Sequence, residues 1–340
     1  MLLTIWFLLW GILWAVYFLL DGFDLGLGIL LPGLGRTEED RRLIYRVMEP
    51  HWDGNEVWLI AAGGVTFAAF PTAYAALFSG LYTPLMLILF ALIFRGVTFA
   101  FRDQSENPRW RRLWDACLFW GSLLPALLFG VAFANLFRGL PLDAEGHFQG
   151  TLLTLLNPYG LAGGLLFVLL FCLHGALWLA VKTDGEMHRR AAATARSLWP
   201  WLLVLAVIFL LASRRVTRLW DNYFTYPLLL LLPLATAGAL VLTCLWMRRE
   251  AWWRAWFASA GTIAGVTLFG VVGLYPHLIP SNLDPAYSLT VYNAASSPFT
   301  LKIMLGVALT FVPLVIAYQT WAHYLFKDKV KEAGLEEEGY

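Results

Sequence analysis

The chain has 340 residues, of which 59% are hydrophobic and only 14% charged, and its formal net charge is +1. Soluble domains are roughly 45–50% apolar and about 25% charged, so this chain has too little polar surface for a water-soluble body. A net charge close to zero also gives no electrostatic argument for nucleic acid as a partner. The composition therefore indicates an integral membrane protein.

Apolar runs bounded by charged clusters predict about nine membrane-spanning helices. A bilayer core about 30 Å thick is crossed by roughly 20 apolar residues in a helix, which satisfies its own main-chain polar groups. In chain order the predicted helices lie near 3–30, 53–70, 73–101, 114–137, 159–182, 198–213, 223–247, 253–275 and 299–326. Only a short turn around Pro71 separates the second from the third, and the sixth is the shortest.

The segments between these helices predict no soluble domain. Residues 36–50 have the pattern of a short amphipathic cytoplasmic helix closed by Pro50, and 327–340 form a charged tail. The longest loops, 138–158 and 276–298, are poor in charge and are predicted on the outer side. We therefore expect a single all-α polytopic membrane domain over 1–340, with two four-helix bundles, one extra helix and a cytoplasmic tail.

The positions of the basic residues predict the orientation. With nine spans the loops alternate sides, and most of the 24 Lys and Arg residues fall on one side. Cytoplasmic loops are enriched in Lys and Arg, so the N-terminus is expected outside and the C-terminus in the cytoplasm. The cluster RRVTR at 214–218 opposes this rule. It could bind lipid headgroups or a partner, or the boundaries of the sixth span are wrong.

Four carboxylates and one arginine are predicted at a similar depth, near the cytoplasmic ends of the first three spans. Asp21 and Asp24 of DGFDLG are three residues apart and share one helix face, and Asp53 and Glu56 of HWDGNEVWL repeat this spacing. Arg95 lies toward the same end of the third span. These groups could be interfacial, could form a structural ion pair with Arg95, or could be a proton-entry path. Removal from water raises the pKa of a carboxyl group toward neutrality, which suits proton transfer.

Small side chains on the first helix predict a close helix–helix contact. Gly22 and Gly26 are four residues apart, which leaves one side of the helix bare. Such small-residue faces let two membrane helices approach closely.

The histidines and cysteines do not indicate a cofactor or metal site in this chain. His174 is the histidine well inside a predicted span, and haem-carrying bundles commonly pair axial ligands across helices. A hydrogen-bonded core histidine is therefore favoured over a haem ligand. Cys117, Cys172 and Cys244 lie in apolar runs without a CxxC pair, which is typical of buried small side chains.

Several longer stretches together resemble subunit II of the cytochrome bd-type quinol oxidases, including the cyanide-insensitive branch. They are DGFDLGLGIL (21–30), PHWDGNEVWLIAAGGVTFAAFPTAYAALFSGLY (50–82), FRGVTFAFR (94–102), RWRRLWD (109–115), GVAFANLFRGLP (130–141), LLNPYGLAGGL (155–165) and SSPFTLKIML (296–305). The resemblance extends from the first predicted helix to the last and is weakest over 198–260.

This resemblance implies a haem-bearing partner, subunit I, in the bacterial cytoplasmic (inner) membrane. The partner is expected to hold two b haems and one haem d, and the complex to oxidise quinol, reduce oxygen to water and generate a proton gradient. Subunit II is expected to be haem-free and not catalytic by itself. A small single-helix subunit, membrane lipids and a structural quinone are further partners known in some members.

The resemblance also implies a role for the carboxylates, as part of a proton path from the cytoplasm toward the oxygen-reduction site. The matching positions are Asp24 and Asp53, with Asp21 beside them. The supporting polar or ion-pair residues are expected to be His51, Trp52, Glu56 and Arg95. The alternative function is a proton-coupled membrane transporter, for which broken helices at the membrane midplane would be expected.

Overall fold

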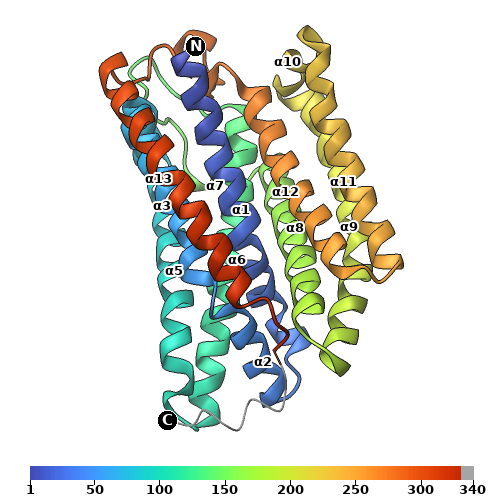
Figure 1. Cartoon of the computed structure of the whole chain (residues 1–340). Coiled ribbons are helices and arrows are strands. Elements are labelled where there is room, and N and C mark those ends of the chain that lie inside the picture. Colours follow the sequence, from blue (N-terminus) through green and yellow to red (C-terminus); the bar gives the residue numbers. More distant parts are fainter. Residues whose placement is uncertain (331–340) are drawn as a thin grey trace.

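The computed structural model describes residues 1–330 and is almost entirely helical (Figure 1). The α-helices are α1 (Leu2–Leu34), α2 (Glu38–Met48), α3 (Trp52–Ala69), α4 (Pro71–Gly80), α5 (Tyr82–Phe101), α6 (Pro108–Arg138), α7 (Leu152–Leu155), α8 (Pro158–Lys182), α9 (Gly185–Val216), α10 (Leu219–Thr225), α11 (Leu231–Arg248), α12 (Trp252–Leu274) and α13 (Pro298–Leu325). The remaining elements are the 3₁₀ turns η1 (Arg102–Gln104), η2 (Pro227–Leu230) and η3 (Pro285–Tyr287), and the strands β1 (His277–Ile279) and β2 (Leu289–Thr290).

The long helices form two groups of four and one additional helix (Figure 1). In the first group α1 packs against α3 and α6, and α6 packs against α5; the second group contains α8, α9, α11 and α12. The groups join where α1 and α6 pack against α8 and α1 packs against α12. Helix α13 crosses α1 and α3, and Leu301 is its buried residue. This arrangement agrees with the predicted two four-helix bundles and one extra helix.

Eight helices within residues 1–330 are long and apolar enough to cross a membrane, one fewer than the nine predicted. The exception is α3, the second predicted span. It has 18 residues, and its first turns carry the polar side chains Asp53, Asn55 and Glu56, which lower its hydropathy. Helix α3 nevertheless packs along α1 inside the first bundle. The difference therefore follows from the polar residues that make α3 of functional interest.

Three predicted spans differ most from the structure, two of them near proline. The span predicted over 73–101 is divided into α4 and α5 at Leu81, and the chain leaves helical geometry at Phe70 as well. The span predicted over 223–247 is interrupted at Tyr226, because the residue before a proline is disfavoured in a helix. The sixth, predicted over 198–213, belongs to the longer helix α9, whose first turns are polar.

The two ends of the molecule differ in structure (Figure 1). At the end that carries the N-terminus, called the N-terminal end below, the two long loops pack together through Leu140 and Pro280 and include the antiparallel pair β1–β2. At the opposite end, called the α2 end, lie the amphipathic helix α2 and the start of the predicted tail. Val330 donates its backbone N–H to Lys182 of α8 over 2.9 Å, so the first tail residues are docked. Residues 331–340 of that tail lie outside the described residues.

Asp115 of α6 joins three elements at the α2 end. Its carboxylate accepts hydrogen bonds from Arg102 Nε at 2.7 Å, Arg41 Nη1 at 2.8 Å and the Tyr45 hydroxyl at 3.2 Å. Burial and the nearby Asp115 charge raise the pKa of Tyr45, so the phenol keeps the proton that it donates. Arg102 also reaches Glu38 at 3.0 Å. This network fixes α2 across the ends of α5 and α6.

Asp40 connects α2 to the second bundle. Its Oδ2 accepts from Arg190 Nη1 at 2.9 Å, a second bond runs from Arg190 Nη2 to Oδ1, and the side chain also accepts from the backbone of Thr37 at 3.0 Å. Partial burial by itself would raise the pKa of Asp40. The hydrogen bonds from Arg190 and Thr37 outweigh that effect and hold the pKa below its usual range.

We predict that this carboxylate makes the attachment of α2 sensitive to acid. Since the folded-state pKa of Asp40 is depressed, its stabilising contribution is present above the unfolded-state pKa of about 4 and is lost as the pH falls through the folded-state value. Asp40→Asn should lower the thermal unfolding midpoint at neutral pH and flatten its decline below about pH 4. The control is Glu39→Gln, the same charge change at an exposed position of α2. Equal pH profiles for the two variants would contradict the prediction.

The predicted close contact of the first helix is confirmed, and the neighbour is α8. A Cβ added to Gly26 would lie 1.9 Å from the carbonyl oxygen of Phe171, and one added to Gly22 would lie 2.7 Å from the Phe171 ring. Across the interface, a Cβ on Gly175 would lie 2.7 Å from the carbonyl oxygen of Phe23. Glycines on both helices thus bring the two backbones together, which increases dispersion contact where lipid supplies no hydrophobic drive.

We therefore predict that Gly26→Ala destabilises the junction of the two bundles. The added methyl group would overlap a backbone carbonyl that cannot move without separating the helices, at a cost of about 2 kcal/mol. Gly63→Ala on α3 is the matched control, since nothing lies within 4 Å of its added Cβ. Thermal unfolding in detergent should show a lower midpoint for Gly26→Ala only. Equal midpoints would show that the interface can open at little cost.

Candidate functional site

A buried ion pair lies between α1 and α5. Arg95 Nη1 donates to Asp21 Oδ2 over 2.9 Å and Nη2 donates to Oδ1, while neither side chain has any exposed surface. The Glu56 carboxylate of α3 lies 3.7 Å from the same guanidinium. Because a planar guanidinium matches a carboxylate in this two-bonded geometry, Asp21 is held in one position. The structural ion pair considered from the sequence is therefore present, and its partner is Asp21.

Asp24 has a different environment, one helical turn further along α1. Its side chain is fully buried, and Oδ2 accepts a hydrogen bond from Asn55 Nδ2 of α3 over 2.8 Å. The same amide nitrogen donates to the Leu20 carbonyl oxygen over 3.1 Å. Oδ1 is buried without a hydrogen-bond partner, and no Lys or Arg among residues 1–330 forms an ion pair with this carboxyl group. Asp24 is thus a buried acid held by a neutral amide.

Asp53 lies apart from these groups. It is exposed in the first turn of α3 at the α2 end, where Oδ1 accepts from the backbone N–H of Gly54 over 2.7 Å. Glu56 follows about one turn deeper, with 24% of its side chain exposed. The structure therefore brings Asp21, Glu56 and Arg95 together with Asp24 nearby, and it places Asp53 at the surface end of the same helix.

His51 and Trp52 are packed through their rings. The buried His51 imidazole stacks on His323 of α13 with ring centroids 4.4 Å apart, and Trp52 stacks on Phe99 of α5 at 4.9 Å. These contacts hold the start of α3 between α5 and α13. Burial also lowers the pKa of His51, with a further contribution from His323, to about 3, so the imidazole is neutral at pH 7.

Sequence reasoning missed two uncharged polar residues of this site. Asn55 is the residue that contacts Asp24, and its position between Asp53 and Glu56 in HWDGNEVWL was the available signal. Gln319 joins α13 to α3 by accepting from Trp58 Nε1 and donating to the Gly54 carbonyl oxygen, both at 2.7 Å. A single amide in an apolar helix of this kind indicates a buried interhelical hydrogen bond.

His174 is a hydrogen-bonded core residue. Its Nδ1 lies 3.1 Å from Ser259 Oγ and its Nε2 lies 3.2 Å from the Leu19 carbonyl oxygen, while the ring stacks on Trp256 with centroids 5.0 Å apart. Both ring nitrogens have hydrogen-bond partners, as expected of the core histidine favoured from the sequence. In the part of the chain that the structure describes, no cluster of three or more His, Cys, Asp or Glu could hold a metal ion.

Comparisons with known proteins give one consistent result. A sequence model of the family described as cytochrome bd terminal oxidase subunit II matches residues 2–326. Cytochrome bd ubiquinol oxidase subunit 2 of Bacillus subtilis is 35% identical over 328 residues, covering 96% of each chain. Cytochrome bd-I ubiquinol oxidase subunit 2 of Escherichia coli K12 is 36% identical over 368 residues, covering 98% of this chain and 96% of that protein.

The structural comparison agrees with the sequence relatives. The solved structure of bd oxidase from Geobacillus thermodenitrificans includes a chain that matches with a TM-score of 0.77 at 20% identity, covering 96% of this chain and 98% of that one. At this identity the match shows a shared fold. It extends over both bundles and α13.

The fold and these relatives define a multi-pass subunit of a respiratory oxidoreductase in the bacterial inner membrane. The chain belongs to the cytochrome bd terminal oxidase subunit II family. Membership implies a partner subunit I and haems in the complex, and it confirms the resemblance on which the sequence analysis relied. The transporter alternative is therefore set aside.

The Asp21–Arg95 pair yields a stability prediction. Arg95→Met would leave the Asp21 carboxylate buried without its cation, which costs about 3–5 kcal/mol. The double variant Asp21→Leu/Arg95→Met should recover much of this loss, because it removes both charges. The control is Arg112→Met, an exposed arginine near the α2 end. The thermal unfolding midpoint of the purified complex is measured for all three variants. If Arg95→Met unfolds at the same temperature as Arg112→Met, the pair does not stabilise the structure.

Proposed function

We propose that this chain carries protons from the cytoplasm toward the oxygen-reduction site of a haem-bearing subunit I, and that it supports that subunit mechanically. The observation that carries the proposal is the Asp24 carboxyl group, which is fully buried, forms no ion pair within residues 1–330 and has one oxygen without a hydrogen-bond partner there. A permanently charged carboxylate in that position would be very costly. If Asp24 binds and releases protons that reach it through transient water molecules, the presence of an acid at this buried position is explained.

Asp21 and Arg95 are assigned a supporting role. Their mutual neutralisation holds a fixed pair of charges beside Asp24, and it fixes α1 against α5. Such a pair orders the local field and helix positions, whereas a group that exchanges protons must not be locked into a strong ion pair. We therefore separate the two acids of DGFD into a structural residue, Asp21, and a proton-carrying residue, Asp24.

The proposed route follows one side of α3. Asp53 at the exposed start of the helix receives protons, and Glu56, about one turn deeper and partly exposed, comes next. Asn55 positions the Asp24 carboxyl group through its 2.8 Å hydrogen bond. His51 and Trp52 keep the first turn of α3 in place through their ring contacts. This route begins at the α2 end, which the distribution of Lys and Arg assigns to the cytoplasm.

The proposed division of labour leaves redox chemistry to the partner. Subunit I would hold two b haems and one haem d and would oxidise quinol near the outer face, while protons for water formation arrive through this chain from the cytoplasm. Opposite-sided chemistry of this kind stores about 2.3 kcal/mol per elementary charge at 100 mV. This chain alone would not be catalytic. A small single-helix subunit, membrane lipids and a structural quinone are further proposed partners of the complex.

We predict that Asp24→Asn slows quinol-driven oxygen consumption by about tenfold or more while leaving the haem absorbance of the complex unchanged. The amide preserves shape and the bond with Asn55 can re-form, but it cannot exchange a proton. Asp53→Asn should act in the same direction with a smaller effect, because an exposed entry group is partly replaced by water. Glu39→Gln on α2 is the control, an exposed acid outside the route.

Two outcomes would contradict this assignment. Unchanged turnover of Asp24→Asn in membranes would show that no rate-limiting proton passes through this residue. Loss of haem absorbance together with activity would show that Asp24 stabilises the complex instead. Proton uptake measured on the α2 side of oriented vesicles tests the direction of the route independently.

A further inference from the structure

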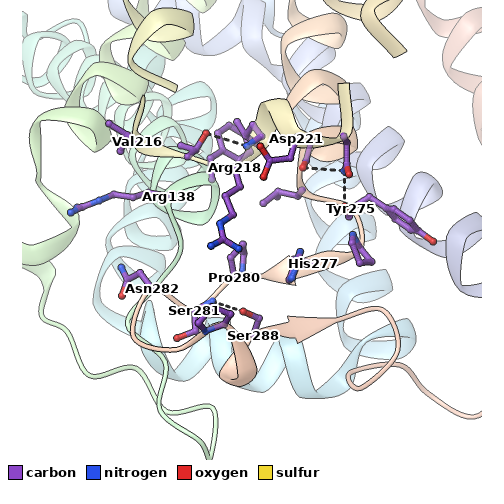
Figure 2. A pocket seen from close by; sticks show the side chains of 18 residues that line it. Arg138, Val216, Arg218, Asp221, Tyr275, His277, Pro280, Ser281, Asn282 and Ser288 are labelled. Carbon is purple, nitrogen blue, oxygen red and sulfur yellow. Dashed lines mark hydrogen bonds between the residues drawn. The ribbon is translucent and has the colours of Figure 1, made fainter. Parts of the chain in front are cut away.

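A cavity at the N-terminal end of the molecule is not used by the proposed proton route. Its volume is about 510 Å³, and it lies among the end of α6, the α9–α10 connection, the end of α12 and the loop that contains β1. Figure 2 shows the side chains that line it. The cavity is therefore at the opposite end of the molecule from Asp53 and the start of α3.

Arg218 is the central charged group of this cavity. Figure 2 shows its side chain extending into the space between the helix ends and the segment around Pro280, with His277 on the far wall. Arg218 forms no ion pair within 4 Å with a carboxylate of residues 1–330, and no hydrogen bond of its guanidinium is found there. Asp221 is the carboxylate that lines the cavity, and Arg138 lies at its rim.

Three other arginines at this end have contacts or positions that explain them. Arg138 is in the last turn of α6, and Arg214 and Arg215 are in the last turn of α9, where a positive charge complements the helix dipole. Arg214 also lies over the Phe224 ring, 4.5 Å from its centroid. Arg218 precedes α10, so it is not in the last turn of a helix, and it has no aromatic ring contact of the kind that Arg214 makes in the described chain. Its side chain is exposed to solvent within the cavity, on the side of the membrane that is usually poor in basic residues, and a bound anion would balance its charge.

The walls provide polar groups suited to an anion bound by Arg218. Ser288 Oγ accepts from the backbone N–H of Ser281 over 2.9 Å and keeps its own hydroxyl hydrogen for donation. Asn282 is fixed by donating to the Gly139 carbonyl oxygen over 2.8 Å. These bonds give the wall on the loop side a defined shape. A guanidinium with two free N–H edges binds phosphate groups in a two-bonded geometry.

We propose that this cavity binds a phosphate group, with Arg218 as its principal ligand. The phosphate could belong to the headgroup of an anionic phospholipid of the outer leaflet or to free inorganic phosphate, and both present the same oxygens to the guanidinium. Bound there, it would connect the loop carrying β1 to the α9–α10 corner. Helix α9 begins earlier than the sixth predicted span but ends close to its predicted end, at Val216, so the RRVTR cluster lies at this corner.

The test uses the purified complex of this chain with its partner, in detergent and depleted of lipid. Isothermal titration calorimetry is carried out with dihexanoylphosphatidylglycerol, with sodium phosphate, and with zwitterionic dihexanoylphosphatidylcholine as the probe for non-specific lipid binding. Arg218→Gln should weaken the binding of the phosphate-bearing ligand by about tenfold. Arg215→Gln removes the same charge at the same end without lining the cavity, and it should leave the affinity within about twofold.

A second variant keeps the test meaningful if Arg218→Gln affects folding. Asp221→Asn removes the negative charge from the cavity wall and should tighten binding by about threefold, an effect that misfolding cannot produce. Binding of phosphatidylglycerol alone would identify a lipid headgroup, and binding of inorganic phosphate with the same dependence on Arg218 would identify the free ion. Equal losses for Arg218→Gln and Arg215→Gln, no binding of either probe, or no tightening in Asp221→Asn would overturn the proposal.

Discussion

The rest of the structure depends on one constraint: the interior of the helix bundle offers no water to a charged group. Arg95 and Asp21 satisfy it by neutralising each other in a two-bonded ion pair without exposed surface. That pair fixes α1 to α5. The Glu56 carboxylate of α3 lies 3.7 Å from the Arg95 guanidinium and so belongs to the same polar group. The first bundle is therefore organised around a polar centre and not around apolar packing alone.

The same constraint separates acids that look equivalent in the chain. Asp21 and Asp24 share a helix face, yet only Asp21 forms an ion pair with an arginine in the described chain. Asp21 faces Arg95 of α5, whereas Asp24, one turn further along α1, faces Asn55 of α3. Asp24 accepts a hydrogen bond from the neutral amide of Asn55, and its other oxygen has no hydrogen-bond partner in the described part of the chain. One turn of helix thus distinguishes a carboxylate in an ion pair from a buried carboxyl group held by a neutral amide.

The second bundle contributes support for the first. Glycines of α1 and α8 bring the two backbones into contact, and His174 of α8 reaches both Ser259 and the carbonyl oxygen of Leu19. At the α2 end, Asp115 and Asp40 connect α2 to both bundles through arginines. At the N-terminal end, helix ends and loops line an open cavity that contains the side chain of Arg218. The buried acids Asp21 and Asp24 therefore belong to the centre of the first bundle, whereas the cavity that Arg218 lines lies at the N-terminal end.

The sequence by itself determined the membrane class and the approximate helices, and it predicted the acidic residues of the candidate site, because hydropathy and charge are properties of local segments. It also indicated the close approach at Gly22 and Gly26. Only the tertiary structure decided which acid meets Arg95, that Asn55 holds Asp24, that Asp53 stays exposed, and where proline interrupts two spans. Those outcomes depend on the rotation and relative height of helices distant in the chain, and local pattern does not encode either quantity.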